Sequence, residues 1–175
     1  MDQFFQISLI FFFVFLNGFF VAAEFAIVKV RGSRIEQRVV EGVFTAKIAK
    51  KILENLDAYL SACQVGITFA SLALGWIGEP FLARQLEPVF NFLGIKSEAL
   101  LHSFAFGVAF GIITYLHIVV GEMAPKSLSI RLAERTALWV ALPLYLFYKT
   151  FIPFIAILNH SSMFLLKLIG VNSAG

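Results

Sequence analysis

Two carboxylates stand at the ends of long apolar stretches and are the first residues that could do chemistry. A charge at mid-membrane costs at least about 2.5–3.5 kcal/mol on insertion scales, so it needs a partner, a proton or an ion. Glu24 lies five residues before Lys29, and an interfacial pair with a nearby base explains it equally well. Glu122 follows Gly121, whose carbonyl loses its helical partner because Pro125 has no N–H. An oxygen-rich helix break of this kind predicts a site for a hard cation.

The same segment has a simpler interpretation. Gly121–Ser127 reads Gly-Glu-Met-Ala-Pro-Lys-Ser, which is also a plausible helix stop at the membrane surface. In that case Glu122 pairs with Lys126 one helical turn away. We favour the cation site, because irregular backbone at membrane depth is tolerated where it lines a cavity or is buried in protein.

A stripe of small and polar residues supplies further oxygens. Thr68 and Ser71 are three residues apart and share one helix face with Gln64. Such stripes more often serve tight helix packing, but their hydroxyls can also bind an ion. Magnesium takes oxygen ligands and usually keeps several waters. Asn17 and Glu122 would complete such a ligand set with the two hydroxyls if the three helices that carry them converge.

Other chemistries have less support. His102, His117 and His160 fall on different predicted elements, so we expect no transition-metal site from the histidines. The single cysteine, Cys63, excludes an internal disulfide and a cysteine-based zinc site. No nucleophile-elbow, zincin or P-loop motif occurs, so we do not expect an enzyme. Nothing in the sequence suggests nucleic-acid binding.

The elements that must hold these residues are membrane helices. Of the 175 residues, 59% are hydrophobic, 21 are Phe and 14% are charged, whereas a soluble domain is roughly 45–50% apolar. Three stretches have the length of about 20 residues that a span requires. They are residues 4–28, 59–78 and 99–121. We therefore predict a single all-α integral membrane domain, residues 1–175, with three spanning helices.

Two further regions complete the predicted domain. Residues 29–57 alternate basic and apolar positions and indicate an amphipathic juxtamembrane helix on the membrane surface, or alternatively a loop helix packed on the domain. Residues 137–168 are apolar but contain Pro143 and Pro153. We predict a broken helical region there, with a re-entrant pair of short helices favoured over a fourth span.

Basic residues predict the orientation. The 29–57 segment holds seven of the 14 Lys and Arg residues, and the 78–98 connector holds two. Because cytoplasmic flanks are rich in Lys and Arg, we expect the N-terminus outside and the C-terminus in the cytoplasm of a cell-membrane protein.

Three motifs resemble the transmembrane domain of the CorC/cyclin-M family. They are Asn17–Ala26 (NGFFVAAEFA), Tyr59–Thr68 (YLSACQVGIT) with its continuation to Trp76–Pro80 (WIGEP), and Gly121–Ser127 (GEMAPKS). The last is the most specific, and the likeness covers nearly the whole chain.

This resemblance implies a homodimer in membrane lipid that exports Mg²⁺ in exchange for Na⁺ through a cytoplasm-facing site. It assigns metal ligation to Glu122, Thr68 and Ser71. Asn17, the carbonyl of Gly121 and a carbonyl near Ala22 complete our candidate set. Where the family often has Ser, this chain has Val21, Ala22 and Ala23, and it has Ser71 where the family often has Asn. The CBS and CorC-type cytoplasmic domains usual in the family are absent from this chain. The alternative is a membrane anchor or ion sensor that does not transport.

Overall fold

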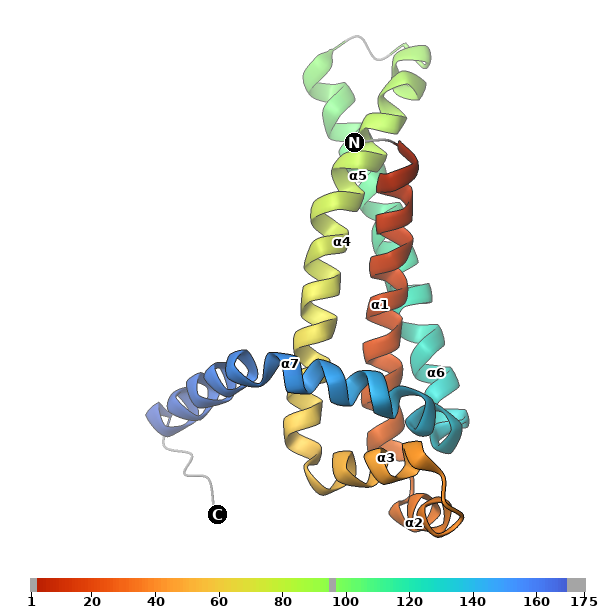
Figure 1. Cartoon of the computed structure of the whole chain (residues 1–175). Coiled ribbons are helices and arrows are strands. Elements are labelled where there is room, and N and C mark those ends of the chain that lie inside the picture. The colour runs from red at the N-terminus through yellow and green to blue at the C-terminus, as the bar shows by residue number, and fades with distance from the viewer. Residues whose placement is uncertain (1–2, 95–96, 170–175) are drawn as a thin grey trace. The chain divides into compact units, whose positions relative to one another are not determined.

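A computed structural model describes residues 3–94 and 97–169, and all regular structure within these ranges is helical. The chain divides into two compact units. Unit 1 combines the residues up to Ala22 with Gly66–Arg131, and unit 2 combines Ala23–Val65 with the residues from Leu132 onward. Figure 1 shows the helices of both units. Each unit is described by itself below.

Unit 1 is built from long apolar helices. Helix α1 (Gln3–Lys29) contributes its first part, α4 (Leu56–Phe92) its larger part, and α5 (Glu98–Leu116) continues through a π-helical segment, η1 (His117–Met123), into α6 (Ala124–Arg131). Ile10 and Val14 of α1, Leu74 and Phe81 of α4, and Ile113 of α5 form one buried cluster. This cluster fixes three helices beside one another around the polar residues considered below.

The outer faces of these helices carry large exposed hydrophobic side chains. Phe11 and Phe15 on α1, Trp76 on α4 and Phe110 on α5 are all more than half exposed. A soluble protein rarely exposes so much apolar surface, whereas lipid tails cover it without cost. Four helical stretches are long and apolar enough to span a membrane, namely Gln3–Lys29, Leu56–Phe92, Glu98–Arg131 and Ala133–Leu168. The all-α membrane fold that we predicted is therefore confirmed.

Unit 2 contains the amphipathic part of the chain. The 29–57 segment that we expected as one amphipathic helix forms two, α2 (Gly32–Val40) and α3 (Phe44–Glu54), separated by a turn in which Gly42 has a φ of +83°. Helix α3 buries its apolar face and packs against α7 (Ala133–Leu168), while Lys47 and Lys51 remain exposed. The predicted separation of basic and apolar faces is present.

An arginine ties α2 to α7. The Arg38 side chain donates hydrogen bonds to Glu134, with Nε to Oε1 at 2.6 Å, and to Glu41, with Nη1 to Oε2 at 3.0 Å. The bond to Glu134, and then that to Glu41, raises the pKa of the Arg38 guanidinium above its ordinary value. Arg38 therefore stays charged, although such an exposed pair contributes little to stability.

The prolines interrupt the helices less than we expected. Helix α4 continues through Pro80 and Pro88, beyond residue 78, where we expected the second span to end. Helix α7 likewise runs unbroken through Pro143 and Pro153, in place of the broken region that we predicted over 137–168. In membrane helices, neighbouring groups can satisfy the backbone that a proline frees, so a proline there is a weaker stop signal than in water.

Candidate functional site

Four residues from three helical elements of unit 1 form one hydrogen-bonded cluster, which we call the polar cluster: Asn17 on α1, Ser71 on α4, and His117 and Gly121 on η1. Asn17 Nδ2 donates to the Gly121 carbonyl at 2.9 Å. Ser71 Oγ donates to Asn17 Oδ1 at 3.1 Å and lies 3.0 Å from His117 Nε2. Asn17 is only 1% exposed. A buried amide on one apolar helix thus links two others.

The Gly121 carbonyl is open to Asn17 for the reason that the sequence suggested. In a regular α-helix this oxygen would accept from the N–H of residue 125, and Pro125 has none. The chain does not break there. It widens into the π-helical segment η1, in which the N–H of Ala124 bonds the carbonyl of Val119, five residues back. Widened turns of this type often occur at functional sites.

Two glycines allow the helices to approach at the polar cluster. A Cβ added to Gly121 would lie 3.2 Å from Asn17 Nδ2 and 3.2 Å from His117 Cδ2. A Cβ added to Gly18, beside Asn17, would lie 3.0 Å from Cγ of Pro125. Small residues of this kind permit close packing of membrane helices. The cluster therefore depends on glycine on both sides of the α1–η1 contact.

The direction of the hydrogen bonds assigns the histidine tautomer. The Ser71 hydroxyl has one hydrogen, which it donates to Asn17 Oδ1. Toward His117 the hydroxyl must therefore accept, so the hydrogen lies on Nε2 of the imidazole. The chain of donors runs from His117 through Ser71 to Asn17 and ends on the Gly121 carbonyl. All four groups are satisfied without a charged partner.

The structure brings together only part of the predicted ligand set. Asn17, Ser71 and the Gly121 carbonyl converge, and the Ala22 side chain is buried on α1. The side chains of Thr68 and Glu122 are exposed. His117 was not among the ligands predicted from the sequence. A signal for it was available, since His117 precedes Gly121 by four residues and so shares its helix face.

The donor set suits a cation better than an anion. An amide oxygen, a hydroxyl oxygen, a backbone carbonyl and an imidazole nitrogen all offer lone pairs once their hydrogens turn away. Ser71 Oγ lies 3.1 Å from Asn17 Oδ1 and 3.0 Å from His117 Nε2. Adjacent ligands on an octahedral ion with bonds of about 2.1 Å are about 3.0 Å apart. The spacing of Ser71 Oγ from Asn17 Oδ1 and from His117 Nε2 therefore matches two edges of such a shell, whereas the Gly121 carbonyl faces Asn17 Nδ2, which is not a ligand atom.

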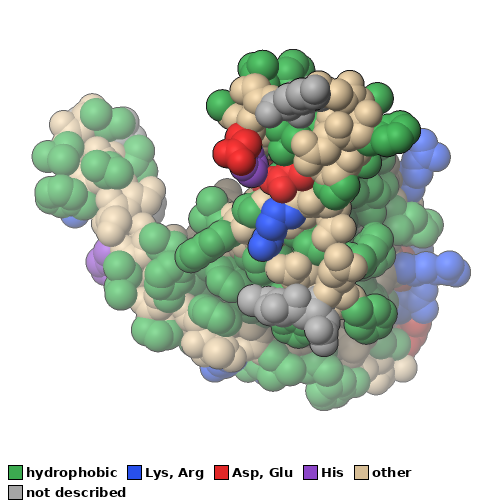
Figure 2. All heavy atoms as spheres, turned by 90° about the horizontal axis from the view of Figure 1, so that it is seen from above, with side chains coloured by type: hydrophobic (Ala, Val, Ile, Leu, Met, Phe, Trp, Pro, Cys, Tyr) green, Lys and Arg blue, Asp and Glu red, His purple; other side chains and the backbone are tan. Residues whose placement is uncertain are grey.

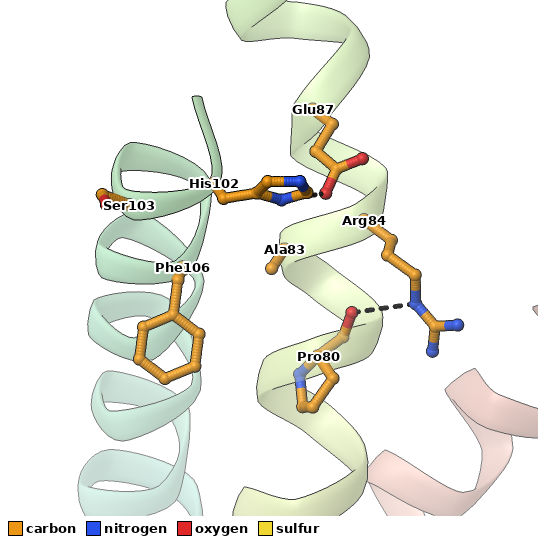
Figure 3. A pocket seen from close by; sticks show the side chains of 7 residues that line it. All are labelled: Pro80, Ala83, Arg84, Glu87, His102, Ser103 and Phe106. Atoms are coloured by element: carbon orange, nitrogen blue, oxygen red, sulfur yellow. Dashed lines mark hydrogen bonds and ion pairs between the residues drawn. The ribbon is translucent and has the colours of Figure 1, made fainter. Parts of the chain in front are cut away.

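A second group of polar residues lies between the C-terminal end of α4 and the N-terminal end of α5. Figure 3 shows Glu87 of α4 and His102 of α5 pointing toward each other, with His102 Nδ1 2.9 Å from Glu87 Oε1. Arg84 turns back along α4 and donates from Nε to the Pro80 carbonyl at 3.1 Å. These residues border an open hollow of about 510 Å³. Figure 2 shows acidic, basic and histidine side chains gathered among hydrophobic ones at this end. In the described residues no three His, Cys, Asp or Glu side chains group as a metal site.

The fold and the polar cluster define a multi-pass helical membrane protein with a polar site between three helices. The family model of the cyclin M transmembrane N-terminal domain matches residues 8–175. This chain therefore belongs to the cyclin M membrane-domain family. This membership is consistent with a family of divalent-cation transporters.

Relatives from bacteria agree with this assignment. The chain is 52% identical over 168 residues to UPF0053 protein YugS and 47% identical over 174 residues to UPF0053 protein YhdT, both of Bacillus subtilis. It is 36% identical over 155 residues to the uncharacterized protein Rv1841c of Mycobacterium tuberculosis. These alignments cover 96%, 99% and 89% of this chain but 39%, 38% and 44% of the relatives. The chain thus spans less than half the length of these relatives.

Proposed function

We propose that this domain moves Mg²⁺ across the cell membrane, out of the cytoplasm, in exchange for Na⁺. The observation that carries the proposal is the polar cluster, in which oxygens of Asn17, Ser71 and Gly121 meet inside a bundle of apolar helices. Buried polar groups in a membrane are costly and commonly mark ion pathways. The resemblance to the CorC/cyclin-M family supports the choice of ion and the coupling to sodium.

The polar cluster supplies neutral ligands, so the charge of a divalent ion needs a carboxylate. Glu122 directly follows Gly121, whose carbonyl belongs to the cluster. Its exposed side chain would meet an arriving ion first and help remove its outer waters. Thr68 and the Ala22 carbonyl are the further oxygens of the proposed path. We propose that the polar cluster opens toward the cytoplasm, because the basic segment 29–57 follows α1 in the sequence and basic segments are typical of the cytoplasmic side.

Flux measurements with a charge-neutral substitution test this proposal. We expect Glu122→Gln to lower Mg²⁺ flux at least about tenfold, since loss of a group that supports a metal site typically costs 10–100-fold in affinity or activity. The full chain is reconstituted into Na⁺-loaded liposomes, and entry of external Mg²⁺ is followed with a dye inside them. Glu98→Gln, an exposed carboxylate in the first turn of α5, is the matched control.

The outcomes separate the alternatives. Wild-type flux that depends on the Na⁺ gradient and falls in Glu122→Gln supports coupled transport. Tight Mg²⁺ binding without flux would instead identify an ion sensor or anchor for the regulatory CBS and CorC-type domains expected elsewhere in such proteins. Wild-type flux in Glu122→Gln would show that this carboxylate is not a ligand.

We also propose that two copies of the domain associate through α5. Four small residues spaced four apart are all exposed on this helix: Ala99, Ser103, Gly107 and Gly111. A Cβ at Gly107 or Gly111 would meet nothing within 4 Å. A stripe of small residues lets two membrane helices approach closely, so this face fits a second copy of α5.

Enlarging this stripe is expected to separate the dimer. In Gly107→Leu/Gly111→Leu the protomer itself should be undisturbed, because both positions are open and Leu favours helix over Gly by up to about 1 kcal/mol. Light scattering in mild detergent should change from dimer to monomer. Val108→Leu, which is exposed beside the stripe, should leave the mass unchanged. A dimer that persists in the double variant would place the interface elsewhere.

A further inference from the structure

We infer that His117 is itself a ligand of the proposed cation site, so that the site binds Mn²⁺ and Co²⁺ more tightly than an all-oxygen site would. This inference rests on the proposed function and specifies its substrate class. His117 was not among the ligands expected from the sequence. Its Nε2 atom lies 3.0 Å from Ser71 Oγ, on the segment that also carries the Gly121 carbonyl.

The imidazole is held where a ligand is needed. His117 and Gly121 are four residues apart on η1, and a Cβ at Gly121 would lie 3.2 Å from His117 Cδ2. The ring is half-buried and turns its Nε2 atom to Ser71, which also contacts the amide of Asn17. A histidine with only a packing role could point into the surrounding apolar face. This one places its Nε2 atom 3.0 Å from the Ser71 hydroxyl, one of the oxygens proposed to bind the ion.

Ion binding requires that the Nε2 atom of His117 carries no hydrogen. Without an ion, the hydrogen on Nε2 is donated to Ser71. To bind a cation, the neutral ring carries its hydrogen on Nδ1 instead and offers the Nε2 lone pair. The Ser71 hydroxyl hydrogen turns away from Asn17 Oδ1, which frees both oxygens. The distances of 3.0 and 3.1 Å between these atoms then become edges of the coordination shell.

The ligand chemistry sets the preference between ions. Oxygen ligands suit both Mg²⁺ and Mn²⁺, whereas an imidazole nitrogen adds affinity for first-row transition metals, less for Mn²⁺ than for Co²⁺, and adds little for Mg²⁺. A set of two side-chain oxygens, one carbonyl and one imidazole therefore favours Mn²⁺ and Co²⁺. Removing the nitrogen should weaken binding of these two ions by a larger factor than binding of Mg²⁺, which would depend more on the oxygens.

Metal binding and spectroscopy on the full chain test the assignment of His117. Binding of Mg²⁺, Mn²⁺ and Co²⁺ is measured by calorimetry for the wild type, His117→Gln and the control His102→Gln. Gln at position 117 keeps an N–H that can reach Ser71, so the hydrogen-bonded fold is retained. Electron spin-echo spectroscopy of bound Mn²⁺ reports directly whether a nitrogen nucleus is coordinated, which a structural role for the ring would not produce.

We expect ¹⁴N modulation in the wild type and in His102→Gln and its loss in His117→Gln, with Mn²⁺ and Co²⁺ affinity falling at least about tenfold. Magnesium affinity should fall by a clearly smaller factor than the affinities for Mn²⁺ and Co²⁺. Mg²⁺ binding without ¹⁴N modulation on Mn²⁺ would overturn the inference and leave the proposed transport intact. An equal loss for all three ions in His117→Gln would also overturn it. A wild-type chain that binds no divalent ion would refute both.

Discussion

Replacing Asn17 by leucine is expected to abolish divalent-cation binding and to destabilise unit 1. The Asn17 amide makes both of the contacts that join α1 to the other helices of the polar cluster, to the Gly121 carbonyl and to Ser71. Leucine has the same branched skeleton of side-chain atoms but no polar atom, so it removes one proposed ligand and leaves the Gly121 carbonyl without its partner. A buried group left unsatisfied costs about 1–3 kcal/mol.

Two measurements check the Asn17→Leu prediction. Calorimetry with Mg²⁺ and Mn²⁺ should show no binding, and thermal unfolding in detergent should begin at a lower temperature than in the wild type. Ser8→Ala is the matched control, because Ser8 is a polar residue of the same helix whose hydroxyl bonds only the Phe4 carbonyl at an exposed position. Wild-type Mg²⁺ affinity in Asn17→Leu would exclude the polar cluster as the ion site.

Gly66→Ala is expected to be the most damaging methyl addition in unit 1. A Cβ at Gly66 would clash with three ring atoms of Phe20, including Cγ at the base of the ring. Phe20 is 2% exposed and has little room to turn. Because the obstacle is a buried ring and not the tip of a flexible chain, α1 and α4 must separate. Overpacking of this kind costs about 1–3 kcal/mol.

Gly75→Ala provides the control for Gly66→Ala. Gly75 lies on the same helix, and its added Cβ would meet only Glu79 Oε1 at an ordinary contact distance of 3.6 Å. Both substitutions gain the same helix propensity from alanine, so the difference between them isolates the clash with Phe20. Unfolding followed by circular dichroism should show Gly66→Ala less stable than the wild type and Gly75→Ala equal to or above it. Equal stabilities would show that α1 and α4 are not in close contact.

The apolar runs predicted the existence of the long helices, because only helices satisfy their own backbone in lipid. The proline positions misled the prediction of helix ends. Pro80 in α4 and Pro153 in α7 lie within continuous helices. The sequence could not predict this, because local propensity does not reveal which neighbouring groups compensate for the missing N–H. The unexpected length of α4, about 55 Å at 1.5 Å per residue, follows from this difference.

The candidate site was partly predictable. Pro125 indicated that the Gly121 carbonyl would be open, and the structure shows Asn17 bonded to it. Whether a side chain faces inward depends on helix rotation, which spacing alone does not determine. Ser71 therefore lies in the polar cluster, while Thr68, three residues earlier, is exposed. His117 was not predicted because its hydrogen-bond partner, Ser71, comes from another helix. Which of these residues bind an ion remains a prediction.

The π-helical segment η1 sets the register in which Gly121 faces α1. Its hydrogen bonds reach back five residues, so it accommodates one residue more than an α-helical turn of the same hydrogen-bonded length. Conversion to α-helix would rotate the residues on one side by about 100° relative to the other, the angle of one residue in 3.6 per turn. That rotation would bring a neighbour of Gly121, either Val120 or Glu122 according to its direction, to the surface facing α1. The extra residue of η1 is thus what sets the Gly121 carbonyl, and not a neighbouring residue, opposite Asn17.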